Sequence, residues 1–285
     1  MSESQPLVSV IIPAYHAAPY IAEAIDSVLG QTYQHIEIIV VHRDSGDGTD
    51  AVLKPYLSKK AILYIEQEGK GLSNARNLGI RRAHGEFIAL LDADDIFLPE
   101  KIEKQVGYFE KHPHCDVCYS GAWHFMDGKP DMLLKLNYTY YSGDAVLPNL
   151  LERNFIAPSN VMLRRNSIDH AGFFDEELRR SEDWEYWMRL SHRGESFCFL
   201  GENLAKIRLH ADSMSYSWAA KMEERKTNLR ILKGLRSELS PEERHQLGID
   251  RAIFRHRMLL GYTYFGNYFI PLQWLHRWIQ RNRLQ

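Results

Sequence analysis

Residues 87–95 read FIALLDADD, an apolar run that stops on three carboxylates. Five consecutive apolar residues bounded by charge are typical of a strand buried on both faces, in a parallel sheet covered by helices. The acids then lie at the edge of the core, where they repel one another unless a cation or a hydroxyl network lies among them. Hard oxygen ligands of this kind suit Mg or Mn. The alternative is that Asp95 caps the helix beginning at Pro99 while the other two acids are solvated.

Strands and helices alternate before this stretch. Buried strands are predicted at residues 7–12, 36–41 and 61–65, the first of them ending at Pro13, and each is followed by a helical or turn-to-helix pattern. The strand that ends at Asp92 is the fourth. The alternation predicts an α/β fold with a mostly parallel central sheet flanked by helices, and a ligand site outside the carboxyl ends of the strands.

The spacing of elements changes beyond Pro99. Helices are predicted at 99–111 and 182–192, and strands at 115–119, 159–164, 197–200 and 204–209. From about Trp218 the pattern is helical, with breaks at Pro241 and Pro271. We therefore expect an α/β domain over residues 1–215 and a helical C-terminal extension over residues 216–285.

Composition places the chain among soluble globular proteins, with 45% hydrophobic and 25% charged residues. The polar N-terminus lacks the basic flank of a signal peptide, and no apolar stretch reaches the roughly 18 residues of a membrane span. The three cysteines are too few for a disulfide framework, and their odd number fits a reducing cytoplasm. Cys115 and Cys118 would point to opposite faces of a strand, which favours buried core cysteines over a metal or redox site.

Charge is distributed unevenly along the chain. Residues 251–285 hold six arginines and no acid, whereas residues 1–250 hold 29 bases and 37 acids. From Phe254 onward the arginines are interleaved with aromatic residues, and a helix at 271–279 would place Leu272, Leu275, Trp278 and Ile279 on one face. This pattern is typical of a helix in a membrane interface. The alternative is a helix packed on the first domain or on a second copy in a homodimer. No nucleic-acid-binding module is recognisable.

Four motifs occur in an order that resembles the family 2 glycosyltransferases. They are VSVIIPAY at 8–15, GLSNARNLGI at 71–80, LDADD at 91–95 and EDW at 182–184. The resemblance covers about residues 7–215 and implies a GT-A-like glycosyltransferase domain, inverting and metal-dependent, with Mn or Mg as cofactor. It also implies a nucleotide-sugar donor and a saccharide or lipid-linked acceptor, as in bacterial polysaccharide or glycolipid assembly at the inner face of the plasma membrane.

The resemblance assigns roles to individual residues on the donor side. Asp94 is expected to bind the metal that stabilises the leaving diphosphate, with Asp95 and the late His210 completing or supporting the metal shell. Asp92 is expected near the ribose. Arg76, in a helix after a glycine-bearing loop, could reach the diphosphate, although a surface arginine is the alternative. The other donor-binding candidates are Pro13, Ala14, Tyr15, His42, Ser73 and Ala93.

Inverting transfer needs a base on the acceptor side, and Asp183 is the candidate. Glu182 is expected to position this base or to bind the acceptor, and the alternative for both acids is capping of the helix that they begin. Trp184 and Trp187 are candidates for sugar stacking or for core packing. Ser213 and Ser215 follow His210 in a candidate lid over the donor.

One departure from the family pattern concerns the donor base. Two adjacent Asp follow the second strand in the family, and the first accepts a hydrogen bond from uracil, whereas this chain has His42 and Arg43. A UDP-sugar remains favoured, but GDP and dTDP become more plausible. Two alternative functions stay open: a catalytically impaired nucleotide-sugar-binding protein, and a sugar nucleotidyltransferase. The second is disfavoured because residues 13–16 read PAYH where a Gly-rich basic loop would be needed.

Overall fold

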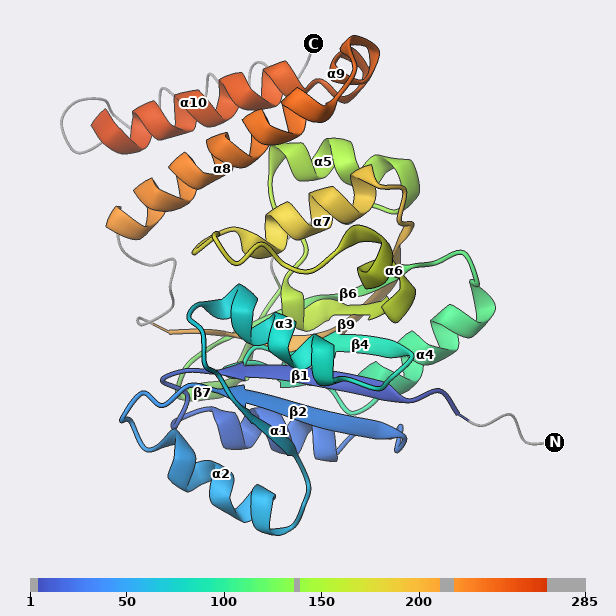
Figure 1. The fold of residues 1–285 in the computed structure, drawn as a ribbon, viewed down its shortest axis with the longest axis vertical. Helices are drawn as coiled ribbons and strands as arrows, with labels where there is room; N and C mark the ends of the chain where they lie inside the picture. Colours follow the sequence, from blue (N-terminus) through green and yellow to red (C-terminus); the bar gives the residue numbers. More distant parts are fainter. Residues whose placement is uncertain (1–4, 136–138, 211–217, 266–285) are drawn as a thin grey trace. The chain divides into compact units, whose positions relative to one another are not determined.

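The computed structural model of the protein describes residues 5–135, 139–210 and 218–265 (Figure 1). The chain divides into two compact units, Met1–Ala211 and Asp212–Gln285, and each is described by itself. The predicted lid at Ser213 and Ser215 and the predicted helix at 271–279 lie outside the described residues.

The first unit is built on one nine-stranded sheet. Its strands are β1 (Val8–Ala14), β2 (Ile36–His42), β3 (Leu63–Glu66), β4 (Phe87–Leu90), β5 (Ile96–Phe97), β6 (Val117–Met126), β7 (Lys129–Leu134), β8 (Val161–Arg164) and β9 (Phe197–Leu209). They are ordered β3-β2-β1-β4-β8-β6-β9-β5, with β7 paired to β6. The pairings make β1 to β4, β6 and β9 run one way and β5, β7 and β8 the other. The sheet is thus mostly parallel, as predicted.

Helices cover both faces of the parallel half (Figure 1). Those of the first unit are α1 (Ile21–Leu29), α2 (Thr49–Ser58), α3 (Leu72–Arg82), α4 (Lys101–Lys111), α5 (Val146–Glu152), α6 (Arg165–Ala171) and α7 (Glu182–His192), with 3-10 turns at η1 (Gly143–Ala145) and η2 (Pro158–Asn160). One side of β1 packs in a core with α1 and α2, and the other faces α3, where Gly79 lies against Ile11 and Val41. A Cβ at Gly79 would lie 2.5 Å from Ile11 Cγ2, so only glycine allows this close approach. Every residue of β1 and β4 is buried, which confirms the strands predicted from continuous apolar runs.

Two strand predictions are wrong in extent. β1 continues through Pro13 to Ala14. Its pairing to β4 ends at Ile11, so Pro13 has a neighbouring strand on one side only, β2, and a proline is tolerated there. The two short strands predicted at 197–200 and 204–209 form a single strand, β9, which runs parallel to β6. The register between β6 and β9 shifts on both sides of Gly121. This irregularity lets β9 continue through Gly201, Glu202 and Asn203, which separate the two predicted strands.

The three cysteines are all in the first unit, and two of them are paired. Cys115 and Cys198 form a disulfide with their Cα atoms 6.0 Å apart, joining the segment before β6 to the start of β9. Cys118 is free and buried, as expected for a core cysteine. The composition argument for unpaired cysteines is therefore wrong for this pair, because spacing along the chain does not show which residues adjacent strands bring together.

The second unit consists of α8 (Trp218–Glu238), α9 (Pro241–Leu247) and α10 (Ile249–Phe265). A capping box begins α9: the backbone N–H of Glu243 donates to Ser240 Oγ at 3.2 Å, and Ser240 N–H donates to Glu243 Oε2 at 2.7 Å. Gly248 ends it in the left-handed conformation, with φ of 65°. Among the helices of the described ranges, none is long and apolar enough to cross a membrane.

Candidate active site

The acids that follow β4 do not play equivalent parts. Asp95 is buried, and both of its carboxylate oxygens are engaged: Oδ2 accepts from Ser159 Oγ at 2.6 Å, and Oδ1 accepts from the backbone N–H of Arg208 at 3.0 Å. Burial, and then repulsion from the neighbouring acids, raises the pKa of Asp95 well above its ordinary value. Both carboxylate oxygens of Asp95 thus have partners within the protein, and Glu100, not Asp95, takes the N-cap position of α4.

Asp94 and His210 meet across the site, as predicted. Asp94 Oδ2 lies 2.9 Å from His210 Nε2, although the two residues are far apart in the sequence. Burial and repulsion from Asp92 raise the pKa of Asp94, while His210 opposes that shift. Within the described ranges, no group of three or more His, Cys, Asp or Glu is arranged to hold a metal ion. A carboxylate and an imidazole nonetheless fit an ion such as Mg or Mn, which takes much of its coordination from substrate phosphates and water.

Arg208, near the end of β9, connects this cluster to two acids from other segments. Its Nε donates to the backbone carbonyl of Asp94 at 2.9 Å, its Nη1 pairs with Asp127 Oδ1 at 2.9 Å, and its Nη2 pairs with Glu23. The guanidinium also lies 4.8 Å from the centre of the Tyr20 ring. Sequence reasoning missed Arg208, and its only signal was a cation two residues before His210.

Arg76 is buried, so the alternative of a surface arginine is wrong. The side chain is 1% exposed, its Nη2 pairs with Asp92 Oδ1 at 2.7 Å, and its Nη1 pairs with Glu182 Oε1 at 2.9 Å. Burial alone would lower the pKa of Arg76, but Asp92 and then Glu182 outweigh it and raise that pKa. Both terminal nitrogens are thus used inside the protein. The geometry favours a bridge between two acids over direct contact with a diphosphate.

The rest of the motif at 73–77 also cross-links the protein. Asn77 Nδ2 donates to the Phe174 carbonyl at 2.9 Å, and Phe174 N–H donates to Asn77 Oδ1 at 3.0 Å. Asn74 Nδ2 donates to Glu176 Oε2 at 2.8 Å. The hydroxyl of Ser73, in the first turn of α3, is buried and lacks a partner. This motif therefore holds α3 against the turn that leads to α7.

Asp183 lies in the first turn of α7, beside the bridge made by Arg76. Its Oδ2 accepts from Asn154 Nδ2 at 2.8 Å and its Oδ1 from the Trp184 backbone N–H at 2.8 Å. Burial, and then the adjacent Glu182, raises the pKa of this half-buried carboxyl to about 7, with Arg76 opposing the shift. Ser181 takes the N-cap position with φ of 57°, so Asp183 is not the N-cap residue, although its Oδ1 accepts from a backbone N–H in the first turn of α7. A carboxylate with a pKa near neutrality is suited to proton transfer.

Two of the candidate residues belong to the core. Trp184 and Trp187 are buried, and their indole N–H groups donate to the carbonyls of Leu150 at 2.7 Å and Ile156 at 3.1 Å. Their stacking role is therefore excluded in favour of packing. Asn154 is the residue near Asp183 that sequence reasoning missed, because it lies in an irregular segment without a motif.

The carboxyl end of β2 holds the residues that depart from the family pattern. His42 is fully buried, with Nδ1 3.1 Å from Asp50 Oδ1 and 3.2 Å from the Tyr64 hydroxyl, while its Nε2 has no partner. Arg43 lies over the ring of Tyr15, which is 57% exposed. Pro13 and Ala14 form the neighbouring end of β1, and half-buried Ala93 lies between the acids after β4.

Asp47 ties the loop after β2 to the loop after β1. It accepts from the Ala18 N–H at 3.0 Å, from Ser45 Oγ at 2.8 Å and from Thr49 Oγ1 at 2.7 Å. Burial alone would raise its pKa, but hydrogen bonds from Ala18 and Thr49 lead a larger, opposite effect and lower it. Asp47 and its partners thus fix the conformation of the two loops. His42 and Arg43 differ from the family pattern in the side chains that they place at the end of β2.

Comparison with known proteins agrees with this geometry. The model of the Glycosyl transferase family 2 matches residues 9–172. An uncharacterized glycosyltransferase of Rickettsia prowazekii is 33% identical over 87% of this chain and 80% of its own length. The Bacillus subtilis protein TuaG, named for teichuronic acid biosynthesis, is 32% identical over 77% of this chain and 86% of its own.

Solved structures share the fold at low sequence identity. S. aureus TarS 1-349 in complex with UDP has a TM-score of 0.69 at 20% identity, covering 96% of this chain and 78% of that one. The mannosyltransferase PcManGT of Pyrobaculum calidifontis, in complex with GDP-Man and Mn2+, has a TM-score of 0.66 at 16% identity, covering 94% and 77%. The first unit therefore has the predicted GT-A fold, and the chain belongs to the family 2 glycosyltransferases.

Proposed function

We propose that this protein is an inverting glycosyltransferase that moves a sugar from a nucleoside diphosphate to an acceptor hydroxyl in bacterial surface polysaccharide or glycolipid assembly. The observation that carries the proposal is the connected chain of side chains from Asp92 through Arg76 and Glu182 to the adjacent Asp183. It fixes a carboxylate suited to proton transfer at a defined position relative to the acids after β4. A protein that only bound a nucleotide sugar would not need this arrangement.

Asp183 is the proposed general base. As a carboxylate it accepts the proton of the acceptor hydroxyl while that oxygen attacks the anomeric carbon from the side opposite the diphosphate, which inverts the configuration. The hydrogen bond from Asn154 fixes the orientation of one carboxylate oxygen. With a pKa of about 7, Asp183 is about half ionised at neutral pH, so the rate should rise with pH and level off above that value.

Asp94 and His210 are the proposed protein ligands of Mn or Mg. A bound divalent cation would supply charge stabilisation to the leaving diphosphate. Asp92, held by Arg76, would face the ribose, and Asp95 would keep the Asp94 segment in place through Ser159 and Arg208. These assignments leave Asp95 outside the metal shell.

A UDP-sugar is the favoured donor. The solved structures with the same fold hold UDP in one case and GDP-Man in another, so the fold accommodates either base. The similarity to TuaG, which is named for teichuronic acid biosynthesis, supports an acceptor in polysaccharide assembly. We propose that this acceptor is a saccharide or a lipid-linked saccharide and that the reaction takes place on the cytoplasmic side. Homodimer formation remains a proposal from the sequence.

Hydrolysis and transfer with a panel of UDP-, GDP- and dTDP-sugars, each with and without Mn, test the function and name the donor. We expect Mn-dependent turnover of one donor class. Asp94→Ala should abolish the Mn-dependent increase in donor affinity, measured by thermal shift. Mn-dependent donor binding without turnover of any donor in the panel would instead establish a nucleotide-sugar-binding protein, the alternative that His42 and Arg43 raise.

A further inference from the structure

The outward face of α10 carries apolar and cationic side chains together. Phe254 is 57% exposed and Met258 is 45% exposed, and with exposed Arg251 they follow the i, i+3, i+7 spacing of one helical stripe. The opposite side of the helix, at Ala252 and Ile253, is buried. Phe254 and Met258 are four residues apart, so their exposed side chains are neighbours and form one apolar patch on this stripe.

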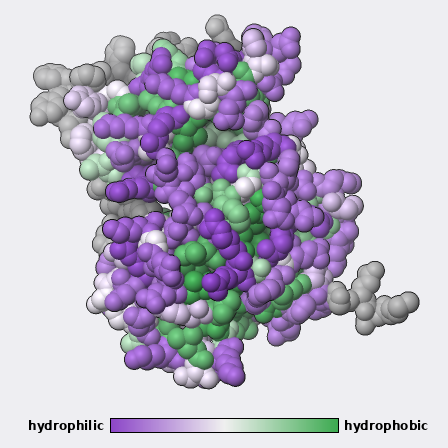
Figure 2. All heavy atoms as spheres, in the orientation of Figure 1, coloured by the Kyte–Doolittle hydropathy of each residue, from purple (hydrophilic) through white to green (hydrophobic). Residues whose placement is uncertain are grey.

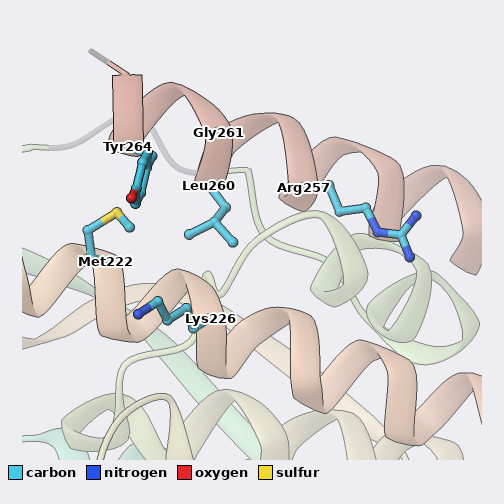
Figure 3. Close-up of a pocket in the computed structure, with 6 residues that line it drawn as sticks. All are labelled: Met222, Lys226, Arg257, Leu260, Gly261 and Tyr264. Atoms are coloured by element: carbon cyan, nitrogen blue, oxygen red, sulfur yellow. The ribbon is translucent and has the colours of Figure 1, made fainter. Parts of the chain in front are cut away.

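A groove between α8 and α10 lies beside this stripe, on the side of α10 that faces α8 (Figure 3). Its volume is about 440 Å³, and it is lined by Met222 and Lys226 of α8 and by Arg257, Leu260, Gly261 and Tyr264 of α10. Figure 3 shows Leu260 and Tyr264 pointing from α10 toward α8, with Lys226 extending toward Met222 and Arg257 pointing away from this apolar cluster. A Cβ placed on Gly261 would meet nothing within 4 Å, so the groove is open at this point. Its walls are apolar and its charges are positive.

The charge of α10 is mostly positive, whereas α8 carries acids as well as bases, among them exposed Glu223. The only acid of α10 is Asp250, and its Oδ1 is paired with Arg236 Nε at 2.5 Å. From Arg251 the sequence holds no further acid. Figure 2 shows hydrophobic and hydrophilic side chains interleaved over these helices. Aromatic side chains that combine an apolar ring with a polar group are also exposed here: Tyr264 by 62% and Trp218 by 51%, whose indole N–H donates to the Thr263 carbonyl at 3.0 Å.

We propose that this surface, defined by Arg251, Phe254, Met258 and the α8–α10 groove, binds an anionic phospholipid bilayer. Phe254 and Met258 would enter the acyl boundary, and the arginines with Lys226 would lie among the lipid phosphates. Charge complementarity selects this occupant, because α10 carries three arginines and a single acid, Asp250, which is paired with Arg236, and such a helix matches a negative surface. Exposed aromatic residues beside cations are the composition of an interfacial helix.

Vesicle co-sedimentation of the full chain tests the proposal. We expect binding to phosphatidylcholine vesicles that contain phosphatidylglycerol, at least tenfold weaker binding to pure phosphatidylcholine, and loss of the difference at high salt. Phe254→Ser with Met258→Ser should weaken binding to the anionic vesicles at least tenfold. Arg251→Gln and Arg257→Gln should each weaken it about fivefold.

Matched controls come from the first unit. Leu57→Ser with Met132→Ser removes two large apolar side chains that are 38% and 56% exposed, and Lys111→Gln removes one exposed cation. Both should bind vesicles like the wild type, and circular dichroism with thermal unfolding verifies that every variant is folded. Wild-type protein that stays in the supernatant with anionic vesicles overturns the proposal, and so does undiminished binding of the Phe254/Met258 variant. A dimer in analytical ultracentrifugation that this variant dissociates, without vesicle binding, would assign the surface to a second copy.

Discussion

The carboxyl ends of β2 and β4 border the same site but are built differently. Behind β4, the side chains of Asp92, Glu182 and Asp183 are fixed by long-range contacts: a buried arginine from α3 and an asparagine from the segment after α5. At the end of β2, His42 contacts a half-exposed acid and a tyrosine of the next strand, and one ring nitrogen has no partner. The proposed reaction end of the site is held by more contacts than the end that we assign to the nucleobase.

Asp183→Asn should break the reaction end with the largest effect. An amide keeps the shape but cannot accept the proton, so kcat should fall about 10³-fold while the Kd for the donor nucleotide changes less than about twofold. Steady-state kinetics and calorimetric titration measure the two quantities. A parallel loss of donor affinity would show that Asp183 contributes to binding and is not the base.

Arg76→Met should break the bridge and lower stability. Removing the guanidinium leaves Asp92 and buried Glu182 without their cation, which should cost about 3–5 kcal/mol in the free energy of unfolding. Chemical denaturation measures this loss. Arg81→Met is the matched control on the same helix, because Arg81 is exposed and pairs with Glu176 at 3.7 Å, and it should cost less than about 1 kcal/mol. Equal effects of the two substitutions would contradict the bridge.

Asn154→Ala should change the pH dependence of kcat, because Asn154 contacts the proposed base Asp183. Asn154 donates to the Asp183 carboxylate and stabilises its charged form, so removing the donor raises the pKa of Asp183 further above about 7. The ascending limb of the kcat profile should move to higher pH by about one unit, with recovery of the rate at alkaline pH. Asn149→Ala, which removes a hydrogen bond to the Ala145 carbonyl, should leave the profile in place. An unchanged profile in both variants would remove Asn154 from the site.

His42→Asn should have the smallest effect. It preserves hydrogen-bonding capacity at the end of β2 without placing a new charge beside Asp50, so the Kd values for UDP and GDP should change by about threefold and kcat at saturation by less than about twofold. Calorimetric titration with both nucleotides checks this. A collapse of kcat would mean that the two ends of the site are not separable.

The sequence predicted the parallel half of the sheet because strands covered on both faces must be apolar throughout. It also predicted the meeting of Asp94 with His210, through family motifs and not through spacing. It missed β5, β7, α5 and α6, which are short or weakly periodic, and it divided β9 at the polar residues around Gly201. A Cβ at Gly121 would lie 2.2 Å from Asn203 Oδ1, and this close packing between β6 and β9 is a tertiary property with no local signal.

Polar partnerships were the least predictable part of the site. Arg76 matched a motif, but helix periodicity could not show that its guanidinium is buried between two acids from other elements. Asn154 and Arg208 carry no motif of their own. Such contacts depend on how distant elements are brought together by the fold, so they become visible only in three dimensions.

β9 has a consequence for biosynthesis. This strand is the last of the sheet along the chain, it contributes the backbone N–H that Asp95 accepts, and it leads directly to His210. During translation the acids after β4 therefore leave the ribosome more than a hundred residues before the strand that contributes this backbone N–H. We expect the hydrogen bonds around Asp95 to be complete only after β9 has paired with β6.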